Sequence, residues 1–265
     1  SERIPGLTYT TYAIGDVHGR ADLLVPLLKA IGRKAEASGR EPRVLFLGDI
    51  VDRGPFSRQA FDLVCDTLDR WPLSRLIRGN HDAYFLEFMT ASEVDEDRFY
   101  RWLLRLGGYA TIESYGLVSE NSIADVAAVF RANFTRHLSA LREAASIIVD
   151  ERFAYVHAGI SPSRPISDQD PKEIMTIRSG FLDYEGDLSH VIVHGHTVTA
   201  SRRAELKSNR IALDTGAYAT GRLTCLAVSS DEKNLEFLTA AQNASGIISG
   251  GVFSSTAVVE RHTAG

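Results

Sequence analysis

Five short motifs, spread over most of the 265-residue chain, each place a glycine beside an Asp, Asn or His that can bind a metal ion. Glycine permits the backbone angles and the close approach that a loop needs in order to aim such a side chain. In chain order the motifs are GDVHG at 15–19, GDIVDRG at 48–54, GNHD at 79–82, HAG at 157–159 and GHT at 195–197. One Gly-Asp pair alone is usually a turn, but five such motifs restrict the chain to folds in which distant loops converge.

The first three motifs each follow a run of residues with strand character. The patterns predict strands over 8–14, 43–47 and 73–77, and helices over 21–37 and 57–68, with Ser57 as the N-cap of the second helix. Strands that alternate with helices in this way pair in parallel through right-handed crossovers. Because ligands bind beyond the carboxyl ends of such strands, these motifs are predicted to share one site.

The rest of the chain predicts a helical insertion and a second group of strands. Helical periodicity over 96–106 and 123–141, interrupted at Gly107 and Gly108, predicts an insertion over about 92–142 that walls one side of the site. Strands are expected over 146–149, 152–156, 191–193, 210–213, 223–229 and 235–239, with a loop over 162–171. Two sheets packed face to face and flanked by helices, an α/β fold of the α+β sandwich type, is the simplest assembly for one domain over 1–265. Small and polar residues from about 245 to 265 predict a poorly ordered tail.

Composition narrows the class of protein. A formal net charge of -5 and a pI of about 5.9 argue against a nucleic-acid partner. Cys65 and Cys225 form no Cys-x-x-Cys pair, so both are expected to be reduced packing residues. No signal segment or membrane-spanning run is recognisable, which favours a cytoplasmic location and no membrane partner. Of the histidines outside the motifs, His137 is predicted on a helix surface, and His194 as packing or as support for neighbouring ligands.

The motifs offer a ligand set for two divalent cations. The candidate ligands are Asp16, His18, Asp49, Asn80, His157 and His196. Carboxylate, amide-oxygen and imidazole ligands suit such cations, and two-metal hydrolases share one carboxylate between ions ~3.5–4 Å apart. Asp49 is the natural bridge, with Asp16 and His18 completing one ion and the other three ligands the second. A water or hydroxide between the ions would attack phosphorus directly.

Four further residues in or beside the motifs suit phosphoryl transfer, which asks a protein mainly for positioning and charge neutralisation. His81 follows the ligand Asn80, so we predict that it is the general acid for the departing oxygen. Asp52 would orient His81 and raise its pKa. Arg53 and Arg78 flank ligands, and their planar guanidinium groups are predicted to clamp the substrate phosphate.

At these residues the chain resembles the PPP family of metal-dependent phosphoprotein phosphatases, which carries GDxHG, GDxVDRG and GNH(E/D) followed by metal-binding histidines. The resemblance spans roughly 13–224 and is to the bacterial and phage branch, with its HAG- and GHT-type later motifs. It implies the calcineurin-like metallophosphoesterase fold, a central β-sandwich between helical layers, whose βαβαβ unit carries the first three motifs. It also implies two Mn²⁺-like ions, with Fe or Zn compatible with the same ligands, and no phosphoenzyme. Arg178 and Tyr218 match a third phosphate-binding arginine and a substrate-side tyrosine.

The leading expectation is therefore a phosphatase of phosphoserine and phosphothreonine in proteins, with phosphotyrosine as a further substrate. The alternative is a symmetrical dinucleoside-tetraphosphate hydrolase or another small-molecule phosphoesterase. Asp82, where many family phosphatases have Glu, also occurs in those hydrolases, but they typically lack the acid that stands here as Asp52. A nuclease is disfavoured because Gly195-His196-Thr197-Val198 lacks the Gly-His-x-His ending of such enzymes. The carboxy-terminal signature of the eukaryotic phosphatases is absent, so no regulatory subunit of their type is expected.

Overall fold

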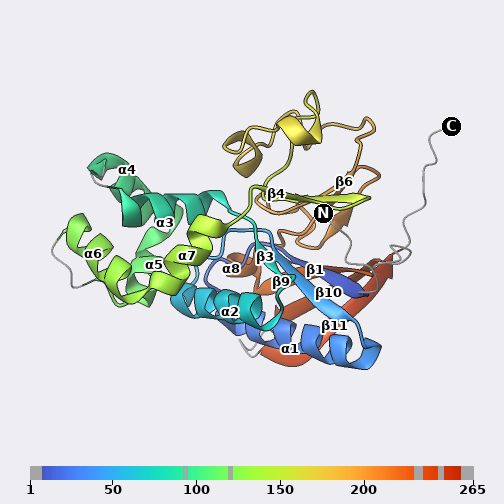
Figure 1. Ribbon diagram of the computed structural model, residues 1–265, viewed down its shortest axis with the longest axis horizontal. Coiled ribbons are helices and arrows are strands. Elements are labelled where there is room, and N and C mark those ends of the chain that lie inside the picture. The colour runs from blue at the N-terminus through green and yellow to red at the C-terminus, as the bar shows by residue number, and fades with distance from the viewer. Residues whose placement is uncertain are drawn as a thin grey trace.

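The computed structural model describes residues 8–91, 93, 95–118, 122–229, 235–243 and 248–257. Two β-sheets pack face to face, and helices α1 (Ala21–Ser38) and α2 (Ser57–Arg70) cover the outer face of the larger sheet (Figure 1). The helices from α3 (Asn80–Thr90) to α7 (Thr135–Glu143) form a group to one side of the sheets (Figure 1). This arrangement confirms the predicted fold of two mixed sheets flanked by helices. None of the described helices is long and apolar enough to span a membrane.

The larger sheet has six strands in the order β11-β10-β9-β1-β2-β3. These strands are β1 (Tyr9–Ile14), β2 (Glu41–Phe46), β3 (Arg75–Leu76), β9 (Arg222–Ser229), β10 (Leu235–Gln242) and β11 (Ile248–Ala257). As predicted, β1, β2 and β3 run parallel, whereas β9 to β11 add antiparallel strands beyond β1. The carboxyl ends of the parallel strands therefore meet at one edge, where the first three motifs begin.

The smaller sheet has five strands in the order β4-β5-β6-β8-β7. They are β4 (Ile147–Val149), β5 (Phe153–Val156), β6 (Val191–His194), β7 (Glu205–Leu206) and β8 (Arg210–Ala212). The central strands β5, β6 and β8 are parallel, and the edge strands β4 and β7 are antiparallel to them. Short 3₁₀ helices at Ile166–Asp168 and Glu173–Met175 lie between β5 and β6. The fourth and fifth motifs directly follow β5 and β6, so they too start at carboxyl ends of parallel strands.

The strand β1 contributes side chains to the hydrophobic core on both of its faces. In β1, Tyr12 and Ile14 face the cluster beneath α1 and α2, while Ala13 between them faces the second sheet. This alternation follows from the two-residue period of a strand. Both faces of β1 are therefore buried, and the carboxyl-terminal parts of β1 and β2 are buried throughout, over Thr11–Ile14 and Pro42–Phe46. Strands fixed on both faces give the motif loops a rigid base.

The helical insertion packs around aromatic side chains. It comprises α4 (Glu96–Arg101), a π-helix (Trp102–Leu106), α5 (Gly108–Ser114), α6 (Ile123–Asn133) and α7. The ring of Trp102 lies 6.2 Å from that of Phe85 and 5.3 Å from that of Phe88, both on α3. Phe130 of α6 lies 4.8 Å from Phe85. The insertion is thus anchored on α3, the helix that begins in the third motif.

Three local predictions were wrong. Phe56, not Ser57, is the N-cap of α2, and the Ser57 hydroxyl instead accepts a hydrogen bond of 3.2 Å from the Asp52 amide. The helix predicted over 123–141 is interrupted at Phe134, which separates α6 from α7. His137 is buried rather than on a surface, because Nε2 lies 2.9 Å from Asp62 Oδ1 and Nδ1 lies 2.9 Å from the Tyr115 hydroxyl.

The carboxy-terminal segment also differs from its prediction. Residues 248–257 form β11, which pairs antiparallel with β10, whereas the pattern predicted poor order from about 245. Residues 244–247 and 258–265 lie outside the described residues.

Candidate metal centre

The five motif loops are hydrogen-bonded to one another. The amides of Val17 and His18 donate to the Asp49 carbonyl oxygen over 3.1 and 2.8 Å, which joins the first and second motifs. The Gly195 amide donates to the His157 carbonyl oxygen over 2.7 Å, which joins the fourth and fifth. Across the two sheets, the His196 amide donates to both carboxylate oxygens of Asp16 over 3.0 and 3.1 Å. Loops from both sheets therefore form one site.

The backbone at the site is in a conformation that side chains other than glycine seldom adopt. Among the described residues, six non-glycine residues have a positive φ, and Arg202 is the one outside the motifs. The five in the motifs are His18, Asp49, Asp52, Arg53 and His196, with φ from 44° to 73°. Such conformations cost of order 1–3 kcal/mol each and cluster at functional sites, where the surrounding structure holds them. Five predicted site residues therefore share a backbone signature of function.

Two glycines are required because the loops pack against carboxylates. A Cβ atom at Gly79 would overlap Oδ1 of Asp49, and one at Gly195 would overlap Oδ1 of Asp16. No L side chain fits at either position without moving a candidate ligand. The glycines of the third and fifth motifs thus serve to bring backbone close to the ligands.

Two groups of donors could each hold a metal ion. One comprises His18, Asp49 and His81, the other Asp49, His157 and His196, with ligand atoms within 4.8 Å of one another in each group. Asp49 belongs to both groups. This is the position expected of the bridging carboxylate that the sequence predicted. His18 Nε2 lies 3.6 Å from Asp49 Oδ2 and His157 Nε2 lies 3.4 Å from Asp49 Oδ1, so the two histidines approach opposite oxygens.

Two predicted ligands complete these groups. Asp16 Oδ2 lies 4.0 Å from His18 Nε2, and Asn80 Oδ1 lies 3.1 Å from His157 Nε2. The histidines are oriented by backbone carbonyls, since Nδ1 of His18 donates to Val51 over 2.8 Å and Nδ1 of His157 to Leu47 over 2.7 Å. Because a carbonyl oxygen only accepts, these bonds leave each Nε2 as the ligand atom.

Buried charge dominates the electrostatics of the site. Burial and the negative charge of Asp214 raise the pKa of Asp16 well above its usual value. For Asp49, burial alone would raise the pKa. The charges of His157 and His81 outweigh this effect and hold the pKa of Asp49 well below its usual range. For His157, burial lowers the pKa, but the charge of Asp49 and their hydrogen bond raise it to about 10. A proton on His157 therefore neutralises Asp49 where a metal cation would otherwise do so.

Residues 9–200 of the chain match the family described as calcineurin-like phosphoesterase. The chain belongs to this family. It is thus a phosphoesterase, a hydrolase, as the motifs predicted, while its place in the PPP branch stays a prediction.

Two curated proteins and one solved structure are similar to this phosphoesterase. The asymmetrical bis(5'-nucleosyl)-tetraphosphatase PrpE of Halalkalibacterium halodurans is 26% identical over 236 residues, which cover 80% of this chain and 87% of the relative. A catalytic subunit of protein phosphatase 2A from Dictyostelium discoideum is 31% identical over 158 residues, which cover 59% of this chain and 40% of the relative. A crystal structure of a candidate diadenosine tetraphosphatase has 22% identity and a TM-score of 0.55, covers 96% of each chain, and supports the fold.

The residues of this phosphoesterase fit the dinuclear metal centre that its family uses. Asp16, Asp49 and Asp214 are buried together, and Asp214 Oδ2 has no hydrogen-bond partner among the described residues. Buried carboxylates need a compensating positive charge. Burial and the charge of His157 lower the pKa of His196 to about 3, so this imidazole is neutral and keeps a lone pair for a metal. Oxygen and imidazole donors suit Mn, Fe and Zn alike, so the donor set does not select one metal.

Asp52 and His81 form the predicted pair. His81 Nδ1 donates to Asp52 Oδ2 over 2.6 Å. Burial lowers the pKa of His81, but the charges of Asp49 and Asp52 and this bond together raise it. Asp52 receives two more hydrogen bonds from the helical insertion, of 2.7 Å each, from Trp102 Nε1 and the Thr111 hydroxyl. The insertion therefore fixes the carboxylate that orients His81.

The predicted phosphate-binding residues fall into two groups. Arg53 lies in the centre, with Nη1 2.9 Å from His18 Nε2 and Nη2 3.1 Å from His81 Nε2, and its guanidinium carbon lies 4.6 Å from the centroid of the Tyr218 ring. Tyr218, on α8 (Ala217–Thr220), also packs edge-on against His18.

The other two arginines contact the edge of the site. Arg178 Nε lies 3.3 Å from the Thr197 hydroxyl of the fifth motif, and its charge helps to lower the pKa of His196. Arg78, by contrast, donates to the carbonyl oxygens of Leu141 and Arg142 at the end of α7, over 2.7 and 3.0 Å from Nη2. In this structure the Arg78 guanidinium group thus binds backbone at the end of α7.

Sequence reasoning gave no role in the site to Trp102, Thr111 and Asp214, and assigned no contacts to Asp82. The Asp82 carboxylate accepts hydrogen bonds from the amides of Asp49, Ile50 and Gly79, and so ties the second motif to the third. Burial and the charge of Asp49 raise the pKa of Asp82 to about 7, against the effect of these bonds. For Asp214 a signal existed, because an Asp-Thr-Gly sequence directly follows an expected strand, as the five motifs do. Trp102 and Thr111 carry no comparable pattern.

Proposed function

We propose that this phosphoesterase hydrolyses dinucleoside polyphosphates. The observation that carries the proposal is the extent of the similarity to PrpE, which covers 80% of this chain and 87% of the relative. The similarity to the protein phosphatase covers 40% of that relative. Proteins alike over nearly their whole length share a domain organisation, and substrate choice in this fold depends on the parts outside the metal-binding loops. The alternative function drawn from the sequence thus becomes the leading one.

The proposed mechanism places each charged group by its contacts. When bound, a pair of divalent cations would polarise the phosphoryl group and activate water at neutral pH. Asp16, His18, Asp49, Asn80, His157 and His196 would hold that pair. Arg53 would donate two parallel hydrogen bonds to the phosphate, with Tyr218 supporting its guanidinium plane.

His81 would protonate the leaving oxygen from Nε2. In this structure Arg53 Nη2 lies 3.1 Å from that nitrogen. A substrate phosphate would draw the guanidinium away, and Nε2 would then be free to face the leaving oxygen. Asp52, held by Trp102 and Thr111, would keep the imidazole oriented during the transfer.

A second function, hydrolysis of phosphomonoesters in proteins, is supported by the completeness of the pair formed by Asp52 and His81. A general acid contributes most when the leaving group is a strong base. The alkoxide of serine or threonine is such a base, whereas a nucleotide phosphate is a far better leaving group. This residue pair therefore suits a phosphoester at least as well as a phosphoanhydride.

Substrate comparison tests the proposal. The purified protein with Mn²⁺ is assayed on diadenosine tetraphosphate, on peptides with phosphoserine, phosphothreonine or phosphotyrosine, and on p-nitrophenyl phosphate. We expect kcat/KM to be highest for the dinucleotide, with AMP and ATP as products if cleavage is asymmetrical as in the name of the PrpE relative. Two molecules of ADP would instead indicate symmetrical cleavage. Efficient release of phosphate from peptides with no turnover of the dinucleotide would overturn the proposal in favour of the second function.

A further inference from the structure

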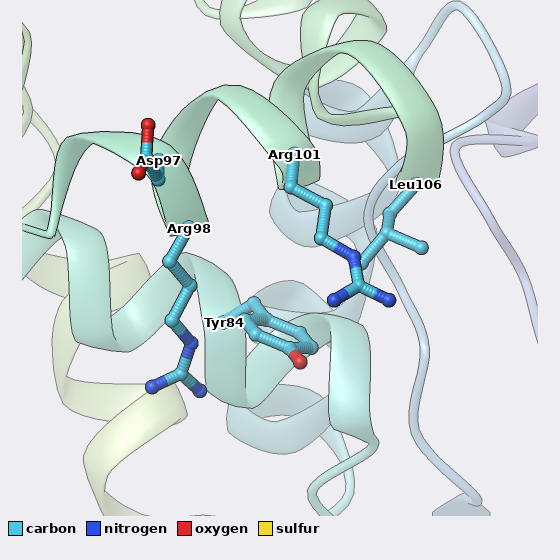
Figure 2. A pocket seen from close by; sticks show the side chains of 5 residues that line it. All are labelled: Tyr84, Asp97, Arg98, Arg101 and Leu106. Carbon is cyan, nitrogen blue, oxygen red and sulfur yellow. The ribbon is translucent and has the colours of Figure 1, made fainter.

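A pocket lies between α3 and the helical insertion, outside the metal centre. It has a volume of about 330 Å³ and is lined by Tyr84, Asp97, Arg98, Arg101 and Leu106. Tyr84 belongs to α3, Asp97, Arg98 and Arg101 to α4, and Leu106 ends the π-helix. Figure 2 shows Tyr84 between the two arginines, whose guanidinium groups both extend to its level, while Asp97 points away. The volume falls at the lower end of the roughly 300–1,000 Å³ typical of small-molecule sites.

Two elements connect the pocket to the candidate metal centre. Tyr84 lies four residues after the candidate ligand Asn80 on α3, which places both on one face of the helix about 6 Å apart along its axis. Leu106 precedes Gly107, whose carbonyl oxygen accepts a hydrogen bond of 3.1 Å from the Arg53 amide. A Cβ atom at Gly107 would approach the Arg53 backbone to 2.7 Å, so the end of the π-helix is in direct contact with the phosphate-binding loop. A substrate longer than one phosphate could reach both places.

The chemistry of the lining suits an aromatic ring carrying negative charge. The Tyr84 ring is held by stacking on Phe88, and the guanidinium carbon of Arg98 lies 4.8 Å from its centroid. Arg98 is also paired with Glu87 over 2.8 Å. Arg101 is exposed, and in the described parts of the chain no hydrogen bond or ion pair engages its guanidinium group. A planar base stacks on tyrosine and guanidinium surfaces, and a guanidinium group with free donors binds phosphate.

We propose that this pocket binds the nucleoside phosphate portion of the substrate that lies beyond the reacting phosphorus. The base would pack against Tyr84, and the adjoining phosphate would accept hydrogen bonds from Arg101. This inference rests on the proposed function and names the residues that recognise its substrate. A phosphopeptide would be attracted by Arg101 as well, but it would make no use of the fixed ring of Tyr84.

The test uses Tyr84→Leu and Arg101→Gln, with Arg105→Gln as the matched control. Arg105 is an exposed arginine of the same π-helix that does not line the pocket. With diadenosine tetraphosphate we expect both variants to lose on the order of 10-fold in kcat/KM, mainly through KM, as for loss of one base stack. With p-nitrophenyl phosphate both should match the wild type, and the control should match it on both substrates. Circular dichroism verifies that the variants are folded.

A binding experiment separates this inference from the function itself. The dissociation constant of AMP is measured by calorimetry on the metal-free protein, where turnover plays no part, and we expect it to rise about 10-fold in both variants. If the wild type does not hydrolyse the dinucleotide, the proposed function fails. If the wild type hydrolyses it but the variants behave like Arg105→Gln, or if AMP does not bind the wild type, the pocket assignment fails. Equal losses on p-nitrophenyl phosphate, or losses on phosphopeptides alone, would also overturn it.

Discussion

The motif loops and the helical insertion contribute residues to the same site in different ways. The loops hold His18, Asp49 and His196 in left-handed backbone conformations, fixed by hydrogen bonds between motifs and by strands buried on both faces. The insertion reaches the site with two side chains, Trp102 and Thr111, that come from helices packed around an aromatic core. The loops store backbone strain to place candidate metal ligands. In the described part of the insertion no non-glycine residue has a positive φ, and the insertion places hydrogen-bond donors.

We expect the motif loops to determine the catalytic chemistry and the helical insertion to determine the choice of substrate. In the proposed mechanism, groups on the loops contact the reacting phosphate whatever the substrate is, so their loss should lower all activities. The insertion and α3 together form a separate pocket around Tyr84 and Arg101, so losses there should depend on the substrate. The two regions meet at Asp52, which belongs to a loop but is held from the insertion.

The largest effect is expected for Asp49→Asn, which removes the carboxylate common to both donor groups. We expect the variant to hydrolyse no substrate measurably. Elemental analysis should find about two metal ions per chain in the wild type and far fewer in the variant. Asp66→Asn is a matched control, because Asp66 is an exposed acid of α2 that is paired with Arg136. Two ions bound to an inactive Asp49→Asn protein would show that Asp49 is not the bridge.

His81→Ala should have the next largest effect. Loss of a general acid lowers kcat by on the order of 10²–10⁴, while the metal content should stay near that of the wild type. The reduction should be larger for a phosphopeptide than for the dinucleotide, because an alkoxide needs its proton more. His81 also stands in one donor group, so loss of metal in this variant would make it a ligand instead. His137→Gln is the control, since His137 too is a buried imidazole beside an aspartate.

The two arginines that flank candidate ligands should differ. Arg53→Ala is expected to lower kcat/KM by on the order of 10² on every substrate, as for loss of a donor to a developing charge. Arg78→Ala should lower it by less than about 10-fold, but should reduce the free energy of unfolding by about 1 kcal/mol, because it removes hydrogen bonds to the end of α7. Urea unfolding and steady-state kinetics measure both quantities. Equal kinetic losses would restore Arg78 as a phosphate clamp.

Trp102→Phe should have a smaller effect than Arg53→Ala and tests the contact between the insertion and the motif loops at Asp52. Phenylalanine keeps the aromatic packing but removes the donor to Asp52, so kcat should fall on the order of 10-fold, as for one hydrogen bond to a charged group. The thermal midpoint should change little. Phe99→Leu alters the same aromatic cluster without contacting Asp52 and serves as the control. If both variants retain full activity, the insertion does not position the catalytic pair.

The sequence predicted the parts of the structure that depend on local pattern. Each motif follows a strand as expected, because buried parallel strands and their glycine turns leave a clear signature at 9–14, 41–46 and 153–156. The break at Phe134 could not be predicted, since Phe130, Phe134 and Leu138 continue the four-residue apolar spacing through it. Nor could β11, whose Ser-Gly-Gly stretch has no apolar alternation and is recruited by backbone pairing with β10.

The candidate site likewise contains residues that local sequence pattern predicts and residues that it does not. Asp16, His18, Asp49, Asn80, His157 and His196 are brought together as the motifs indicated. The roles of Trp102 and Thr111 depend on which side of the insertion packs over Asp52, and no local pattern encodes that choice. The pocket around Tyr84 is formed by side chains from three helices, so it too emerges only in the folded chain.

We propose that six side chains hold two neighbouring cations joined through Asp49. Anomalous diffraction from a crystal of the protein grown with Mn²⁺ would locate both cations. We expect two peaks ~3.5–4 Å apart, one on each side of the Asp49 carboxylate, with His18 and His157 contacting different ions. A single peak, or two peaks with His157 and His196 turned away from both, would contradict it.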